Sequence, residues 1–290
     1  MNNKNTLILK NLVLVDTSYH IFYRFYATLK WFSFAHKKDY EKYIKKNYDW
    51  STNKIFIEKF NKMFIESIIK LLSKKIYYDS NIIFACDSNL IDSWRRKYYS
   101  NYKNNFRKYI HKHPNVKKIF KYTFDILIHK ILITYNNIYY MLVNNVEADD
   151  IIGVICLLMK NYNYKKNIYI ISSDKDFLQL GRKNIKFINF KNKNPIVLNS
   201  REAKAFLLKR IIFGDNSDCI KPIFYKSDIP KKYKKVDILC NKNLLYKIIN
   251  NNSKIKKIIN INKKIIDFNY IPKKYITSII ENFKLLFSIK

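Results

Sequence analysis

The stretch VEADDIIGVICLLMK, residues 146–160, places three carboxylates directly before an apolar run. Its isoleucines and leucines recur at helical spacing, so the acids Glu147, Asp149 and Asp150 occupy the first turn of a helix with one buried face. The helix dipole favours negative charge in that turn, by about 0.3–1 kcal/mol per group. Taken alone, the stretch fits both a helix capped by acids and a functional acid cluster.

Short apolar runs elsewhere in the chain also lead into acids. The predicted strands cover residues 12–15, 81–86, 138–143 and 167–171, with a short edge strand at 187–190. The acids that follow strand ends are Asp16, Asp87, and the pair Asp174 and Asp176. A single aspartate after a strand is usually a turn or cap residue. Acids at several strand ends instead indicate the edge at which open α/β sheets bind ligands.

The remaining segments complete an α/β pattern. Residues 30–52 are rich in Lys, Tyr and Trp, and we expect a basic loop or insertion there. The predicted helices follow Asp16, run from a cap at Thr52 or Asn53 to about Lys75, cover residues 115–140 and extend from a cap at Asn199 or Ser200 to Phe213. The expected fold class is α/β, with a mostly parallel central sheet flanked by helices.

Nine of the 22 acidic residues gather in five groups along the chain. The groups are Asp16; Asp87; Glu147, Asp149 and Asp150; Asp174 and Asp176; and Asp215 and Asp218. So many carboxylates cannot all ionise close together without cations. Oxygen ligands select hard ions such as Mg²⁺ or Mn²⁺. Two such ions about 4 Å apart would bind a phosphodiester, activate a water and stabilise the leaving oxygen.

The segment between Asp87 and residue 107 interleaves cations with aromatic rings. Its members are Trp94, Arg95, Arg96, Lys97, Tyr98, Tyr99, Tyr102, Lys103 and Arg107. Cations neutralise phosphates and flat rings stack on bases, so this composition suits single-stranded or frayed nucleic acid. A solvated basic helix is the simpler alternative for an isolated segment.

The overall charge points to the same partner. The 290 residues carry 56 Lys and Arg against 22 Asp and Glu, a formal net charge of +34, and 48% of the residues are hydrophobic. The chain can therefore build a core, as one large domain or as one domain with an appendage. The excess of positive charge indicates a polyanionic partner, most simply nucleic acid. Compositional bias of an AT-rich genome would also inflate Lys, but it does not explain where the acids lie.

Several classes of protein and site are excluded or disfavoured. Only three glycines occur, at positions 153, 181 and 214, so neither GxGxxG nor GxxxxGK can be formed. No apolar run reaches about 18 residues, which argues against a membrane span. The cysteines Cys86, Cys156, Cys219 and Cys240 form no CxxC pair. We expect reduced core cysteines in an intracellular, reducing compartment such as the cytoplasm, the nucleus or a viral replication site.

Five segments in order resemble the motifs of the flap endonuclease family, in particular its bacterial and phage 5′–3′ exonuclease branch. The segments are LVDTSYHIFYRFYA, FACDSNLIDSWRRKYYSNYKNNFR, VEADDIIG, ISSDKDFLQL and GDNSDCI, covering roughly residues 12–220. The resemblance implies a PIN-like nuclease core over residues 1–199 with a helical arch at about 88–135. It also implies a helical region over residues 200–290 with a degenerate helix-hairpin-helix.

The same resemblance implies Mg²⁺-dependent hydrolysis of DNA at 5′ ends, flaps or nicks in replication or repair. The expected inner metal ligands are Asp87, Glu147, Asp149, Asp150 and Asp174, with Asp16 close by, and the expected outer ligands are Asp176, Asp215 and Asp218. In the arch, Lys103 and Arg95 would contact the scissile phosphate. The nucleic-acid-binding residues would include Trp94, Arg96, Tyr98, Tyr99, Tyr102 and, less closely matched, Arg107.

One departure from the family follows the last acidic motif. The family has a glycine-rich hairpin there that grips duplex through backbone amides and a K⁺ ion, whereas this chain reads KPIFYKSDIPKKYKK without glycine. Close backbone approach depends on glycine, which argues against the K⁺ site. We expect Lys231, Lys232, Lys234 and Lys235 to bind duplex by charge instead, which would make the affinity unusually salt-sensitive.

Two other functions also fit the sequence. The first is a related nuclease that acts mainly on RNA, or on RNA in RNA–DNA hybrids, as in primer removal. The second is a basic protein that binds nucleic acid without cutting it. Retention of all nine acids favours a nuclease over a binding protein, since a decayed enzyme would be expected to lose some of them.

Overall fold

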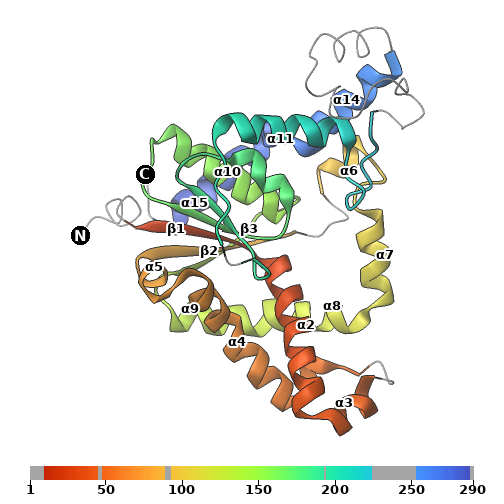
Figure 1. Cartoon of the computed structure of the whole chain (residues 1–290), viewed down its shortest axis with the longest axis vertical. Coiled ribbons are helices and arrows are strands. Elements are labelled where there is room, and N and C mark those ends of the chain that lie inside the picture. The colour runs from red at the N-terminus through yellow and green to blue at the C-terminus, as the bar shows by residue number, and fades with distance from the viewer. Residues whose placement is uncertain (1–9, 45–47, 89–92, 193, 224–252, 288–290) are drawn as a thin grey trace.

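A five-stranded, wholly parallel sheet forms the centre of the molecule (Figure 1). The computed structural model describes residues 10–44, 48–88, 93–192, 194–223 and 253–287. The strands are β1 (Asn11–Asp16), β2 (Ser80–Cys86), β3 (Ile138–Leu142), β4 (Ile168–Ile171) and β5 (Ile185–Ile188), in the spatial order β3-β2-β1-β4-β5. The four main strands and the edge strand predicted from the sequence are all present.

Helices cover both faces of this sheet. Most of the α-helices that the structure describes are α2 (Thr17–Ala35), α3 (Lys37–Ile44), α4 (Lys54–Leu72), α5 (Lys74–Tyr78), α8 (Pro114–Tyr122), α9 (Ile128–Thr134), α10 (Ala148–Asn161), α11 (Ser200–Phe213), α14 (Ser253–Ile266) and α15 (Lys273–Leu286). The arch region contains α6 (Arg95–Tyr98) and α7 (Asn104–Lys112). Short helical segments are η1 (Trp50–Thr52), η3 (Thr123–Leu127), η4 (Lys175–Leu180) and η6 (Phe268–Tyr270).

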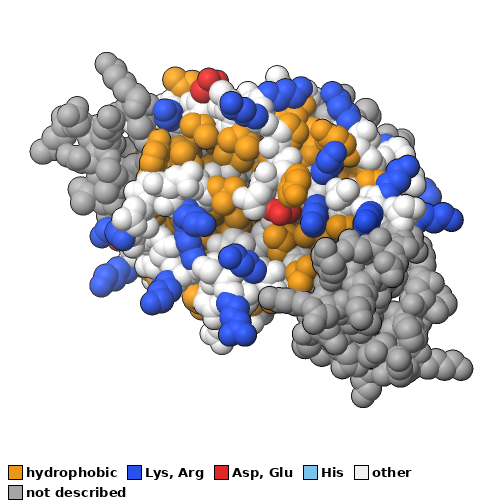
Figure 2. Space-filling model, turned by 90° about the horizontal axis from the view of Figure 1, so that it is seen from above, with side chains coloured by type: hydrophobic (Ala, Val, Ile, Leu, Met, Phe, Trp, Pro, Cys, Tyr) orange, Lys and Arg blue, Asp and Glu red, His pale blue; other side chains and the backbone are white. Residues whose placement is uncertain are grey.

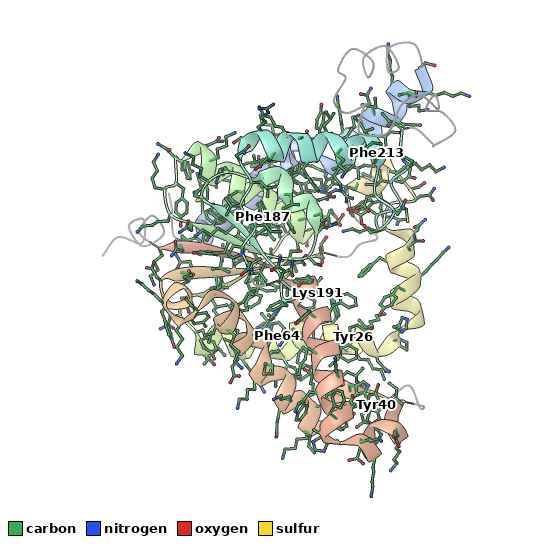
Figure 3. The ribbon with its side chains drawn as sticks, viewed as in Figure 1. Tyr26, Tyr40, Phe64, Phe187, Lys191 and Phe213 are labelled. Carbon is green, nitrogen blue, oxygen red and sulfur yellow. The ribbon has the colours of Figure 1, made fainter. Side chains whose placement is uncertain are left out.

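Alternation along the strands divides the core into two layers. Leu12 and Leu14 of β1 face a cluster with α10 and α15, whereas Val13 and Val15 face a cluster with α2, α4 and α9. Successive side chains of a strand point to opposite faces, so one apolar run serves both layers. In Figure 3 the labelled Phe187 lies in the upper layer and Phe64 in the lower one. The expected fold class, an α/β structure with a parallel sheet, is confirmed.

The expectation of an irregular basic loop at residues 30–52 is wrong. Helix α2 continues to Ala35 and is followed by α3 and η1. Packing explains the difference. The ring centroid of Trp50 lies 5.1 Å from that of Phe32 and 5.0 Å from that of Phe56 on α4. The aromatic residues of this segment therefore extend the lower layer of the main core.

Two helix ends also differ from the prediction. Helix α4 begins after its expected cap Asn53 but ends at Leu72, because Ser73 has a φ of 73° and starts the short α5. The helix expected over residues 115–140 is divided into α8, η3 and α9 and ends at Thr134.

The C-terminal helix joins the same core as the sheet. Ile279 and Phe283 of α15 are fully buried in the cluster that contains α10. The boundary expected at residue 199, with a separate C-terminal region, stays a prediction. Among the described residues, none of the helices combines the length and the apolar character needed to cross a bilayer.

Candidate active site

A cavity of about 580 Å³ opens where β1, β2 and β4 end. Six of the nine predicted acids line it: Asp16, Asp87, Asp149, Asp174, Asp215 and Asp218. The other three, Glu147, Asp150 and Asp176, are buried beside it, with exposed fractions of 1%, 0% and 7%. Acids distant in the sequence therefore meet at one edge of the sheet, as the strand-end pattern predicted.

Asp16 and Asp87 are held by backbone and hydroxyl donors at neighbouring strand ends. Asp16 caps α2 by accepting from the Tyr19 amide at 3.1 Å, and its second oxygen accepts from Ser172 Oγ at 2.8 Å. Asp87 accepts from the Ala148 amide at 2.9 Å, at the start of α10. Burial, with added repulsion from Asp87, raises the pKa of Asp16 to about 7. This carboxyl is thus poised to exchange a proton for a cation.

The acids at the start of α10 cap that helix, which is one of the two roles that the sequence suggested. Glu147 and Asp150 form a reciprocal capping box at the helix start. Glu147 also accepts from Ser93 Oγ at 2.6 Å and pairs with the ammonium of Lys103. Burial alone would raise the pKa of Glu147, but the cations Lys103 and Arg95 outweigh it and hold the value at about 2. Glu147 therefore stays ionised.

Arg95 lies beneath these acids, with an exposed fraction of 1%. Its guanidinium forks onto Asp150, with Nη1 and Nη2 at 2.8 and 2.7 Å from the two carboxylate oxygens. Its other acidic neighbours are Glu147 at 3.4 Å and Asp149 at 3.5 Å. The structure thus directs Arg95 to the carboxylates, and Arg95 is not among the residues that line the cavity; its expected contact with the scissile phosphate stays a prediction.

A second acid group lies across the cavity. Oxygens of Asp176, Asp215 and Asp218 come within 4.8 Å of one another. Arg210 of α11 bridges two of them, with Nε 2.6 Å from Asp176 and a second ion pair to Asp215. Burial raises the pKa of Asp176 to about 6 and that of Asp218 to about 7, and other acids nearby add to both shifts.

This donor set fits hard divalent cations. All nine candidates offer carboxylate oxygens, the ligand type that Mg²⁺ and Mn²⁺ prefer. Burial, and to a smaller extent repulsion from neighbouring carboxylates, raises the pKa values of Asp16, Asp176 and Asp218, so ionising them together is favoured by a compensating charge. Lys103, Arg95 and Arg210 supply part of that charge within the protein.

The arch residues divide into a buried set and an exposed set. Lys103 lines the cavity, whereas Trp94 and Tyr102 are 2% exposed and hydrogen-bond to Asp150 and Glu147 at 2.9 and 3.3 Å. These two rings support the acids, and as placed they are closed to stacking on bases. Tyr98 is 47% exposed and lies beneath the ammonium of Lys264, at 4.9 Å from the ring centroid.

The remaining predicted contacts have the following positions. Arg96 donates to the Tyr102 carbonyl at 3.0 Å, and Tyr99 donates to the Cys219 carbonyl at 2.9 Å. The side chain of Arg107 lies outside the described part of α7, and Lys231, Lys232, Lys234 and Lys235 lie outside the described residues. Of the cysteines, Cys86 and Cys156 are buried and unpaired, Cys219 is unpaired and half-buried, and Cys240 lies outside the described residues.

Several site residues were missed in the sequence. Arg210 is the main one, and its place in the last turn of α11, five residues before Asp215, was the available signal. Ser18 and Ser172 donate to Asp87 and Asp16. The aromatic residues Phe22 and Phe106 also line the cavity. Serine beside an acid at a strand end is too common a pattern to identify such donors.

The raised pKa values predict how stability depends on pH. Between about pH 4 and 7, the folded protein holds protons on Asp16, Asp176 and Asp218 that the unfolded chain releases. The free energy of unfolding of the metal-free protein should therefore fall as pH rises through this range. Glu147 has a lowered pKa of about 2, so its opposite contribution changes only below about pH 4.5.

Thermal unfolding in EDTA at pH 5, 6, 7 and 8 measures this dependence. Mn²⁺ should raise the unfolding temperature more at pH 8 than at pH 5, because protons compete with the ion. The substitution Asp218→Asn removes one titrating group and should flatten the slope in EDTA. An unfolding temperature that rises from pH 5 to 7 in EDTA would contradict the assignment.

Comparisons with known proteins agree with this geometry. A family model described as 5′-3′ exonuclease, N-terminal resolvase-like domain, matches residues 11–206. No curated protein matches the chain in sequence.

Among solved structures, a bacteriophage T5 flap endonuclease in a pseudo-enzyme–product complex with DNA and metal ions has a TM-score of 0.61 at 13% identity. The match covers 96% of this chain and 100% of that one. A T5 5′-exonuclease with bound zinc has a TM-score of 0.56 at 17% identity, covering 94% of this chain and 99% of that one. At such identities the similarity shows a shared fold. Because the family model spans most of the chain, the protein belongs to the 5′–3′ exonuclease family of nucleases, which hydrolyse phosphodiester bonds.

Proposed function

We propose that the protein is a metal-dependent, structure-specific 5′ nuclease that cuts DNA at 5′ ends, flaps or nicks during replication or repair. The observation that carries the proposal is the cavity itself, in which six carboxylates and the ammonium of Lys103 face one space. We infer that Mg²⁺ is the natural ion, in two sites, and that Mn²⁺ substitutes for it.

The overall charge and the upper face of the protein suit a polyanion. The whole chain carries a formal charge of +34, and basic side chains are spread over the upper face with few acidic ones among them (Figure 2). Such a field attracts nucleic acid and raises its rate of association. The cavity, which is lined by acids, is the negatively charged part of an otherwise basic protein. A phosphate would enter it only after bound cations reverse the charge of the cavity.

The residues of the chain divide the catalytic work between them. Divalent ions held in the cavity would lower the pKa of a bound water and stabilise the leaving oxygen. Asp16, Asp87, Asp149 and Asp174 would hold the ions of the first group, and Asp176, Asp215 and Asp218 those of the second. Lys103 would lie beside the scissile phosphate and stabilise the charge that develops on its oxygens. Its ion pair with Glu147 places the ammonium at the cavity wall.

Cleavage of an end-labelled 5′-flap duplex tests the proposal. We expect cutting near the flap junction with Mg²⁺ or Mn²⁺, and none with EDTA. A matched RNA flap in the same assay measures the preference between DNA and RNA. Binding without cutting under both ions would contradict a nuclease and favour a basic binding protein.

A further inference from the structure

The C-terminal end of α14 is hydrogen-bonded to Arg95, which pairs with the acids of α10, and to Gln179 of η4, the segment that carries Asp176. Three backbone groups at this helix end, or just after it, form hydrogen bonds with side chains of other segments. The carbonyl of Ile265 accepts from Arg95 Nε at 2.9 Å, and that of Ile266 accepts from Gln179 Nε2 at 2.9 Å. The amide of Phe268 donates to Gln179 Oε1 at 3.1 Å. The last carbonyls of a helix lack partners within it, so these contacts satisfy groups that would otherwise need water.

Arg95 connects this helix end to the acids of α10. One edge of its guanidinium forks onto Asp150, and the Nε group on the other side reaches Ile265. The arrangement is electrostatically consistent, since a cation is favoured at the negative end of a helix dipole as well as beside carboxylates. At 1% exposure the side chain has little freedom to move, so the acids of α10 and the end of α14 are held at a fixed separation.

Gln179 connects the same helix end to the second acid group. It lies on η4, the segment that Asp174 caps and that carries Asp176. Its Nε2 group donates to the Asp176 carbonyl at 2.9 Å as well as to Ile266. The amide therefore ties the backbone of an acid-bearing residue directly to α14, without touching any carboxylate.

A close approach of α10 to η6 completes the connection. A Cβ atom at Gly153 would lie 2.9 Å from Cγ of the Phe268 ring, closer than side chains tolerate. Gly153 follows Asp150 by one turn of α10, on the helix that presents the first acid group. The glycine thus lets the helix lie against η6, and the ring fixes how close it comes.

We propose that residues 265–268 set the spacing between the two acid groups, with Arg95 and Gln179 as positioning residues. The inference rests on the proposed function, since it concerns how that site holds its ions. It gives residues 265–268 a role in metal binding although none of these four is a proposed ligand. It also gives Arg95 a role that its burial permits, in place of contact with substrate.

The substitution Gln179→Met is the sharpest test, because it removes the amide without changing charge or any carboxylate. We expect Mn²⁺ binding, measured by titration calorimetry, to weaken by roughly 10–100-fold, as found when the groups that orient metal ligands are removed. Flap cleavage at limiting Mn²⁺ should fall in parallel, with kcat rather than KM affected. Saturating Mn²⁺ should restore much of the rate.

Asn137→Leu provides the matched control. Asn137 also bridges two backbone carbonyls with its amide, donating to Tyr77 at 3.2 Å and Ser80 at 3.1 Å, but it lies at the opposite end of the sheet. We expect it to lower the unfolding temperature while leaving Mn²⁺ affinity unchanged.

Gly153→Ala provides an independent second variant. It should weaken Mn²⁺ binding by pushing against Phe268, and Phe268→Leu in the same chain should reverse part of that loss by making room. If the Gln179→Met and Gly153→Ala proteins have lower unfolding temperatures but bind Mn²⁺ as tightly as wild type, this inference is wrong and the proposed function still holds. A folded wild-type protein that neither binds Mn²⁺ nor cleaves the flap would overturn the proposed function, and the inference with it.

Discussion

Replacing Asp174 by asparagine should abolish cleavage while preserving the fold and the binding of DNA. Asp174 lines the cavity and caps η4 by accepting from the Asp176 amide at 2.7 Å. Asparagine keeps an oxygen for this cap, so the local structure should survive. It removes the negative charge that a divalent ion requires. We expect the rate of flap cleavage to fall by about 100-fold or more.

Binding should respond in the opposite direction. In EDTA the acids of the cavity are only partly compensated by Lys103 and Arg210, so they repel phosphate, and the substitution removes one of them. The dissociation constant for flap DNA, measured by fluorescence anisotropy in EDTA, should stay the same or decrease. The Asp174→Asn variant is thus predicted to lose metal-dependent cleavage and to keep metal-independent binding of DNA.

Asp49→Asn is the control for this substitution. Asp49 likewise caps a short helical segment, η1, by accepting from the Ser51 amide at 3.0 Å, but it does not line the cavity. The two variants lose the same charge and keep the same type of cap, and only Asp174→Asn should lose cleavage. Wild-type rates for Asp174→Asn would break the assignment of the site.

The strand-end acids could be predicted because two simple regularities act together. Parallel strands end at one edge of their sheet, and a buried parallel strand appears in sequence as a short apolar run. Asp16 and Asp87 follow such runs directly, so their convergence in space needed no knowledge of side-chain packing. The capping role of the α10 acids was visible for the same reason, from their position before a periodic apolar segment.

Contacts between distant segments could not be predicted in this way. The burial of Arg95 depends on the carbonyl of Ile265, 170 residues later in the chain. Sequence spacing placed Arg95 among basic and aromatic neighbours, which is the composition of a substrate-binding surface. Its actual partners are acids on α10, and only tertiary packing brings them together.

Helix α3 illustrates a different limit. None of its residues is fully buried, and its apolar face consists of the half-buried Tyr40 and Tyr43 against Trp50, which is too short for its period to reveal the helix. A solvated helix rich in Lys and Tyr then looks like a loop in sequence. The neighbouring Trp50 was equally uninformative, because its burial depends on rings from α2 and α4.

Lys103→Met should separate chemistry from binding within the arch. Lys103 lines the cavity, and its ammonium pairs with Glu147. Burial alone would lower the pKa of this group, but Glu147 and other acids nearby raise it well above its ordinary range, so the charge persists at any working pH. A fixed cation beside the scissile phosphate stabilises the transition state more than the bound substrate. We expect kcat to fall by about 100-fold or more, with the dissociation constant for flap DNA changed only a few-fold.

Lys175→Met supplies the matched control, because Lys175 also lines the cavity but is exposed on η4 and has no ion pair among the described residues. Both variants lose one positive charge from the same cavity, so a general loss of attraction for DNA would affect them alike. Only Lys103→Met should reduce kcat, since only Lys103 is held in place by a buried carboxylate. Equal losses in the two variants, or a Lys103→Met protein with near-normal kcat and weakened binding, would assign Lys103 to the capture of DNA rather than to its cleavage.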